Sequence, residues 1–149
     1  MNKRALIIAS LLLALPLYAD FRSIERALRS RLGSPTWIPF LGVARVASNV
    51  IHPNGVHDFQ LAVFEHGSLD RAEAAVIMAR EAVGYTRLVH ARSRGEWTFV
   101  YCKPGERGRV DLLILTSDAS ETVLVRCDVD AQTFADGMDK PEKLASIAK

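Results

Sequence analysis

The sequence has few cysteines, few aromatic residues and no long apolar run. Two cysteines among 149 residues form one disulfide at most, which excludes a disulfide-stabilised scaffold. The longest apolar run, Ala5–Leu15, falls short of the roughly 18–20 residues that a membrane-spanning helix needs. HExxH, CxxC, GxSxG, P-loop and GxGxxG motifs are missing, and the four histidines show no metal-ligand spacing. We therefore expect no cofactor, no metal site and no catalytic residues.

The N-terminus has the pattern of a secretory signal peptide. Lys3 and Arg4 precede the apolar run, and the small residue Ala19 follows it. We predict cleavage after Ala19, so that residues 1–19 are the signal and the mature protein is periplasmic or secreted, without a membrane span. The alternative is an uncleaved N-terminal anchor.

The predicted mature chain carries no net charge. Without Lys3 and Arg4, the 19 basic residues of the whole chain fall to 17, which equals the number of acidic residues. The apparent basicity belongs to the signal, so we expect no nucleic-acid partner. Residues 20–149 have the length of one domain with its own core.

The main structural prediction is a mainly antiparallel sheet of about five strands. Runs of apolar, aromatic and β-branched residues alternate with turn residues. The runs are Val56–Glu65, Thr86–Arg92, Trp97–Cys102, Val110–Thr116 and Thr122–Val129. Turns of about 4–6 residues join the last four runs, which predicts a β-meander.

Helical periodicity predicts the elements that cover this sheet. The first helix spans Phe21–Leu32, a second spans Trp37–Ile51, and a third spans Leu69–Val83 with Ser68 as its N-cap. The third helix should bury the stripe of Leu69, Ala72, Val76, Ala79 and Val83.

The fold class is α+β, with the order β-α-β-β-β-β in a single domain packed by helices. The strand–helix–strand unit at its start predicts that the first two strands run parallel. We divide the mature chain into an N-terminal helical segment (20–52), the α+β domain (53–137) and a loose C-terminal tail (138–149).

The two cysteines are the first candidates for chemistry. Cys102 and Cys127 lie on strands that a third strand separates, at about 9.6 Å, whereas bridgeable Cα pairs lie within about 7 Å. The meander therefore favours free thiols over a disulfide. A thiol enzyme that uses a nearby histidine, His57 or His66, is a further alternative.

Two side-chain groups could form binding surfaces. Trp97, Phe99 and Tyr101 share one strand face, and we interpret them as core residues rather than as a stacking platform for nucleic acid. Basic residues should also gather as a rim at one end of the meander. These are Lys103, Arg107, Arg109 and Arg126, which we interpret as a solvated rim offset by Glu106, Asp111 and Asp128, with an anionic-partner site as the alternative.

The chain resembles a small exported bacterial family known as domain of unknown function 4252. The resemblance covers about Trp37 to Phe134. The residues that carry it include Val56-His57-Asp58-Phe59, Ala62-Val63-Phe64-Glu65, Gly84-Tyr85, Arg92-Ser93-Arg94-Gly95-Glu96, Leu112–Thr116 and Glu121–Arg126. It implies an exported α+β domain with no established reaction and no site residues.

The strand Val110–Thr116 is apolar on both faces, which predicts that something covers each face of the sheet. Our functional prediction is a non-enzymatic interaction module in the cell envelope, with an envelope protein or a second copy as partner. The alternatives are a small-ligand or lipid-binding protein and, less favoured, a thiol enzyme.

Overall fold

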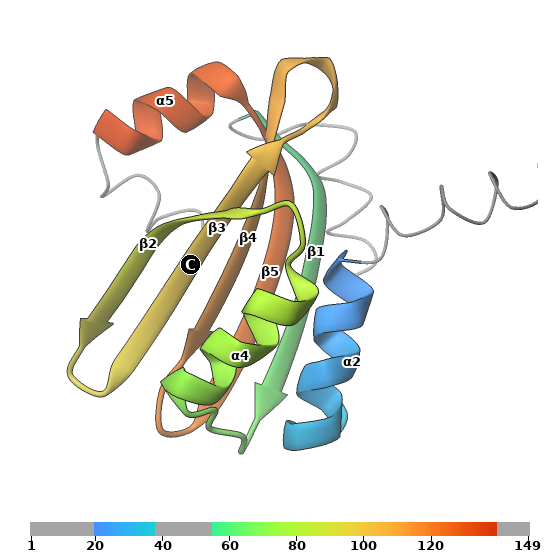
Figure 1. Ribbon diagram of the computed structural model, residues 1–149, viewed down its shortest axis with the longest axis vertical. Coiled ribbons are helices and arrows are strands. Elements are labelled where there is room, and N and C mark those ends of the chain that lie inside the picture. The colour runs from blue at the N-terminus through green and yellow to red at the C-terminus, as the bar shows by residue number, and fades with distance from the viewer. Residues whose placement is uncertain (1–19, 38–54, 140–149) are drawn as a thin grey trace, which may run out of the picture.

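The computed structural model describes residues 20–37 and 55–139, which form a five-stranded antiparallel sheet and three α-helices (Figure 1). The predicted α+β class is confirmed. The elements in chain order are α2 (Asp20–Leu32), β1 (Val56–Glu65), α4 (Arg71–Glu81), β2 (Thr86–Ser93), β3 (Glu96–Pro104), a 3₁₀ turn (Glu106–Gly108), β4 (Arg109–Ser117), β5 (Glu121–Asp130) and α5 (Ala131–Asp139).

The strand order is β1-β5-β4-β3-β2, and every neighbouring pair is antiparallel. The predicted meander of β2 to β5 is confirmed. β1 and β2 run in the same direction, as predicted, but they lie at opposite edges of the sheet. The chain through α4 therefore crosses the sheet from one edge to the other (Figure 1).

Helix α2 forms where the periodicity predicts it. Phe21, Ile24 and Leu28 face the sheet with at most 8% exposure, and the helix ends before Gly33, whose φ of +85° suits glycine. The predicted second helix falls outside the described residues, apart from Trp37, which is 80% exposed and not helical.

Helix α4 differs from the prediction in its start and in its buried face. Its N-cap is Asp70, not Ser68, and the carboxylate accepts the backbone N–H of Ala72 at 3.0 Å. The buried face holds Ala74, Ile77 and Met78, whereas most of the predicted stripe is exposed. In that stripe Val76 is 65% exposed and Val83 71%, Ala72 and Ala79 are also exposed, and Leu69 alone is buried.

The main core lies between the sheet and the helices α2 and α4. It contains Trp97, Phe99 and Tyr101, which confirms their interpretation as core residues. Trp97 and Phe99 have ring centroids 4.9 Å apart, and the Phe99 and Tyr101 rings meet edge to face at 6.2 Å.

The opposite face of the sheet carries a second, smaller cluster at one end. Val56, Leu112, Cys127 and Val129 are buried there, and Phe134 of α5 packs against them. α5 follows β5 directly and continues through Asp139, beyond the predicted boundary at residue 137.

A buried polar network attaches the β1–α4 connection to the sheet. The indole N–H of Trp97 donates to the Leu69 carbonyl at 3.0 Å, and the Leu69 N–H donates to Ser117 Oγ at 3.2 Å. The Thr122 hydroxyl donates to the Gly67 carbonyl at 2.9 Å. These bonds satisfy backbone groups that the connection would otherwise bury unpaired.

Replacement of Thr122 by valine tests this network. Thr122→Val keeps the shape of the side chain but leaves the buried Gly67 carbonyl without its donor, so the free energy of unfolding should fall by about 1–3 kcal/mol. Thr98→Val, on the half-buried opposite face, is the matched control and should cost less than about 1 kcal/mol, because water can replace its bond to Thr116. Equal losses in urea unfolding would contradict the role of the network.

Candidate functional site

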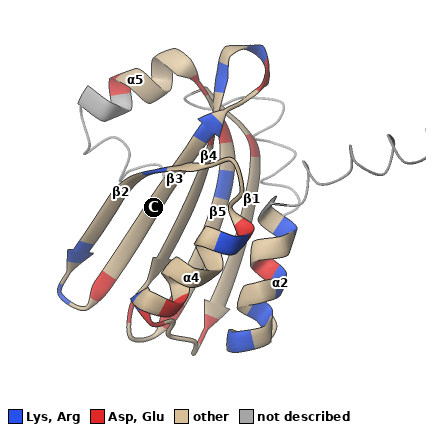
Figure 2. Cartoon of the chain, viewed as in Figure 1, with Lys and Arg blue, Asp and Glu red and all other residues tan. Residues whose placement is uncertain are grey.

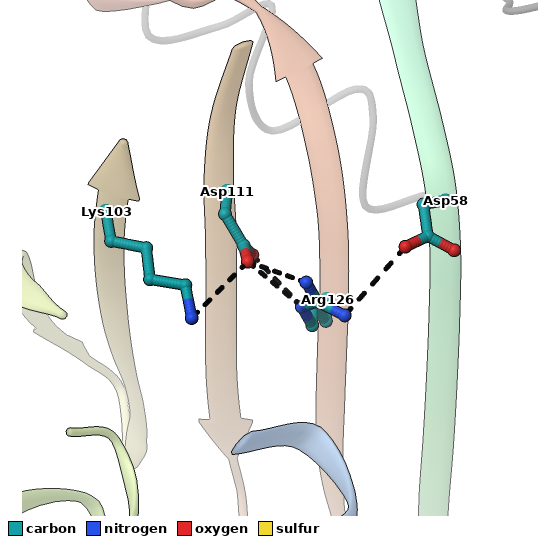
Figure 3. A network of polar contacts seen from close by, with 4 residues as sticks. All are labelled: Asp58, Lys103, Asp111 and Arg126. Carbon is teal, nitrogen blue, oxygen red and sulfur yellow. Dashed lines mark hydrogen bonds and ion pairs between the residues drawn. The ribbon is translucent and has the colours of Figure 1, made fainter. Parts of the chain in front are cut away.

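A group of charged residues lies on the helix-covered face of the sheet, next to Tyr85, and Figure 3 shows four of them, Asp58, Lys103, Asp111 and Arg126, on four neighbouring strands. We call it the Asp111 cluster. It combines side chains from four strands and from the residue before β2: Asp58, Tyr85, Lys103, Asp111, Arg126 and Asp128.

The centre of the Asp111 cluster is a bidentate ion pair. Arg126 Nη2 donates to Asp111 Oδ2 at 2.7 Å, and Arg126 Nε donates to both carboxylate oxygens at 3.1 and 3.2 Å. Arg126 faces Leu113 in the strand register, so it reaches Asp111 diagonally. The Asp111 side chain is 3% exposed, and two parallel N–H···O bonds are the geometry that stabilises a buried carboxylate.

Three neighbours surround this pair. Lys103 Nζ lies 3.8 Å from Asp111 Oδ2 and 4.3 Å from the centre of the Tyr85 ring, a cation–π contact. Asp58 Oδ2 lies 3.9 Å from Arg126 Nη1. The Tyr85 hydroxyl is buried and interacts with Asp111 and Arg126.

The cluster changes the acidity of its members. Burial raises the pKa of the Tyr85 hydroxyl, and the Asp111 carboxylate adds to the effect. Burial also raises the pKa of Asp128, to which Asp111 contributes because the two carboxylates face each other directly across β4 and β5. The guanidinium of Arg126 opposes this rise.

The four basic residues of the predicted rim have different surroundings. Lys103 and Arg126 share Asp111, and Arg109 Nε lies 3.8 Å from Asp130 Oδ1. Arg107 is exposed in the turn between β3 and β4, with no ion pair in the described part of the protein. Most of the positive charge of the rim is therefore offset by carboxylates.

The cysteines have no disulfide, as the strand order predicted. Leu112 of β4 lies between Cys102 and Cys127 in the register. Burial raises the pKa of the Cys102 thiol and, with Asp111 and Asp128 adding to it, raises the pKa of Cys127 to about 12. Neither thiol is activated as a nucleophile needs to be.

Among the histidines that the structure describes, His57 has the most defined place. His57 Nε2 lies 3.1 Å from Asp130 Oδ1, and His57 faces Asp128 in the register. Since neighbouring strand residues point to opposite faces, the side chain of Cys127 faces away from His57. His66 is exposed in the turn after β1, and His90 packs on Phe99 with its ring centroid 5.0 Å away.

The opposite face of the sheet carries an uncharged surface that we call the open face. It consists of two rows of side chains that cross all five strands in register. The first row contains Leu61, Val125, Ile114, Val100 and Val89, in the order of the strands from β1 to β2. The second row contains Val63, Val123, Thr116, Thr98 and Ala91 in the same order. Val89 and Ala91 are exposed, the other eight residues are half-buried, and none of the ten belongs to either core cluster.

Sequence reasoning missed the Asp111 cluster as a unit. Asp111 appeared there as a rim carboxylate, although it is nearly inaccessible and carries the pair with Arg126. Asp58 and Tyr85 were not predicted to belong to a charged cluster. One signal was present, because Asp111 and Arg126 are charges within apolar strands, and a charge at an inward position requires a partner.

The described residues include no group of three or more His, Cys, Asp or Glu side chains that could hold a metal ion. Of the described helices, none is long and apolar enough to cross a membrane. Comparison of the chain with protein-family models, with curated proteins and with solved structures finds no match. The resemblance to domain of unknown function 4252 therefore stays a prediction.

Replacement of Arg126 tests the electrostatic balance of the cluster. Arg126→Met leaves Asp111 buried without its bidentate partner, so the free energy of unfolding should fall by about 3 kcal/mol. Lys103→Met removes the 3.8 Å contact with Asp111 and the cation–π contact with Tyr85, and it should cost about 1 kcal/mol or less. The double variant Asp111→Asn/Arg126→Met should recover much of the loss, because no buried charge remains unpaired. Equal effects of the two single variants in urea unfolding would contradict this balance.

The pKa shifts of two aspartates predict opposite dependences of stability on pH. The pKa of Asp128 is raised in the folded protein, so its contribution to stability falls as pH rises from the unfolded pKa through the folded pKa. The pKa of Asp118 is lowered by hydrogen bonds from the Ser120 and Glu121 amides. Its contribution is present above the unfolded pKa and is lost as pH falls toward the folded value.

We therefore expect Asp128→Asn to raise the free energy of unfolding at neutral pH and Asp118→Asn to lower it. Urea unfolding from acidic to neutral pH measures both effects, and each variant should lose its own part of the pH dependence. A destabilised Asp128→Asn variant at neutral pH would show that the carboxylate is needed for the cluster.

Proposed function

We propose that the mature protein is an exported, non-enzymatic module that binds another protein of the cell envelope through the open face. The observation that carries this proposal is the charge-free composition of the two rows. They cross five strands, and strand spacings of about 4.8 Å give the surface a width of about 19 Å. Contiguous apolar surfaces of this kind mark interaction sites in soluble proteins.

The chemistry of the other face supports a binding role rather than catalysis. The Asp111 carboxylate is held by Arg126 and Lys103, and both thiols have raised pKa values. A catalytic acid, base or nucleophile needs access to a substrate and a suitable pKa. The buried pair therefore fits a structural role for the cluster, and it leaves the open face as the surface for function.

Export is the second part of the proposal, and it depends on the signal pattern in residues 1–19, which lie outside the described part of the structure. A neutral mature chain agrees with a partner that is bound through apolar contact rather than through charge. We infer a periplasmic or extracellular site of action.

Site-specific photo-crosslinking in an exporting bacterial host tests both parts. A benzoylphenylalanine at Val123, in the open face, should form one discrete adduct with another protein. The same residue at Val76, which is 65% exposed on α4, is the matched control and should form none. Mass analysis of the adduct should identify a mature N-terminus at Asp20.

Each possible result decides one part of the proposal. Equal adducts from Val123 and Val76, or a crosslink that closes within the same chain, would contradict partner binding at the open face. Adducts that retain residues 1–19 would contradict cleavage of the signal. An adduct that disappears in a Val125→Lys variant with unchanged stability would support the face as the contact.

A further inference from the structure

Strand β2 is an edge of the sheet and is exposed along its whole length. Only β3 pairs with it among the described strands, so its outer side presents backbone N–H and C=O groups in strand geometry. The other edge differs, because the Thr36 N–H donates to the Val63 carbonyl of β1 at 2.7 Å.

The turn after β2 identifies the backbone groups that point outward. Arg94 and Gly95 form a two-residue loop with φ of +49° and +89°, and Ser93 faces Glu96 as the closing pair. A closing pair of this hairpin type is hydrogen-bonded, and the bonds then alternate along the ladder. The amides of Ser93 and Ala91 therefore point to β3, and those of Arg92 and His90 point to the outer side.

The same strand concentrates positive charge that lacks carboxylate partners. Figure 2 shows Lys and Arg colouring at both ends of β2 and in the turn that follows it. Arg87, Arg92 and Arg94 have no ion pair among the described residues, and neither has Arg71, whose Nη1 lies 3.3 Å from His90 Nε2. Glu96 lies across the hairpin from β2, but its carboxylate accepts a hydrogen bond from the Thr116 hydroxyl on the open face.

We propose that the outer edge of β2 binds an extended, acidic segment of another polypeptide, which adds to the sheet as a sixth strand. The segment would pair its backbone with the outward groups of His90 and Arg92 and would place carboxylates beside Arg87 and Arg92. This surface is the outer backbone edge of β2, whereas the open face takes only the Val89 and Ala91 side chains from that strand, so the inference goes beyond the proposed function and does not rest on it.

The charges and the backbone together select this occupant. A second copy of β2 in an antiparallel pair centred on the strand would bring Arg87 beside Arg92, and like charges in cross-strand positions are destabilising. An anionic membrane or a nucleic acid could meet the arginines, but neither offers alternating donors and acceptors at strand spacing. An acidic strand satisfies both the charges and the outward groups.

A synthetic peptide of alternating glutamate and threonine is the probe, and amide hydrogen exchange in the full mature protein is the readout. Bound peptide should slow exchange of the His90 and Arg92 amides, which have no strand partner among the described residues. The Ala91 and Ser93 amides, already paired with β3, should change little. A peptide of the same composition with its glutamates in one block keeps the charge but loses the alternation, and it should not protect these amides.

Two variants at one position separate charge from backbone pairing. Arg92→Ala removes one positive charge and keeps the outward N–H, whereas Arg92→Pro removes the charge and the N–H. We expect Arg92→Pro to bind the peptide about fivefold more weakly than Arg92→Ala, the effect of one lost hydrogen bond. Unchanged circular dichroism and thermal midpoints establish that both variants fold. If Arg92→Pro does not fold, the test is whether the alternating peptide slows exchange of the amides of residues 90 and 92 in the Arg92→Ala variant. Protection of these amides would support backbone pairing, and its absence would contradict it.

Several results would overturn the proposal. These are equal binding of the alternating and block peptides, equal affinities of the two folded variants, and protection that is confined to amides outside β2. Binding of phosphatidylglycerol vesicles or of a single-stranded oligonucleotide, without any binding of the alternating peptide, would assign the arginines to a membrane or to nucleic acid and would overturn it as well.

Discussion

The ion pair of Asp111 and Arg126 is the constraint on which the sheet depends. Both charges lie on the helix-covered face beside the fully buried Leu113 and Leu124, and the Asp111 side chain is 3% exposed. A shift of one residue between β4 and β5 would place the two side chains on opposite faces and bury one charge without its partner. We therefore interpret the pair as a determinant of register between the central strands rather than as a site of chemistry.

The two faces of the sheet differ in the elements that cover them and in their charge. On the helix-covered face, α2 and α4 cover the aromatic core around Phe99, and the charged cluster occupies the end next to Tyr85. On the other face, α5 covers one end through Phe134, and the rest presents uncharged rows. The charges that stabilise the interior therefore lie apart from the open face and from the outer edge of β2. These are the two surfaces on which we propose binding.

Local sequence patterns predicted the strands well and the buried side of α4 poorly. The alternation in Val56–Glu65 and the turn at Arg94-Gly95 are short-range signals, and both strands and turns appear where they indicate. Helix α4 has apolar residues on more than one side, so Val76 and Ile77 are both plausible inward positions. The sheet decides between them, because the larger Ile77 and Met78 fill the space above the core.

The sequence alone determined the strand order of the meander, and with it the separation of Cys102 from Cys127, because short turns leave neighbouring strands little choice of partner. Only the tertiary structure decided that Asp111 and Arg126 meet, and that β1 closes the sheet beside β5. The pairing of β1 with β5 joins residues far apart in the chain, and the energy of the Asp111–Arg126 pair depends on register and burial, which no local pattern contains.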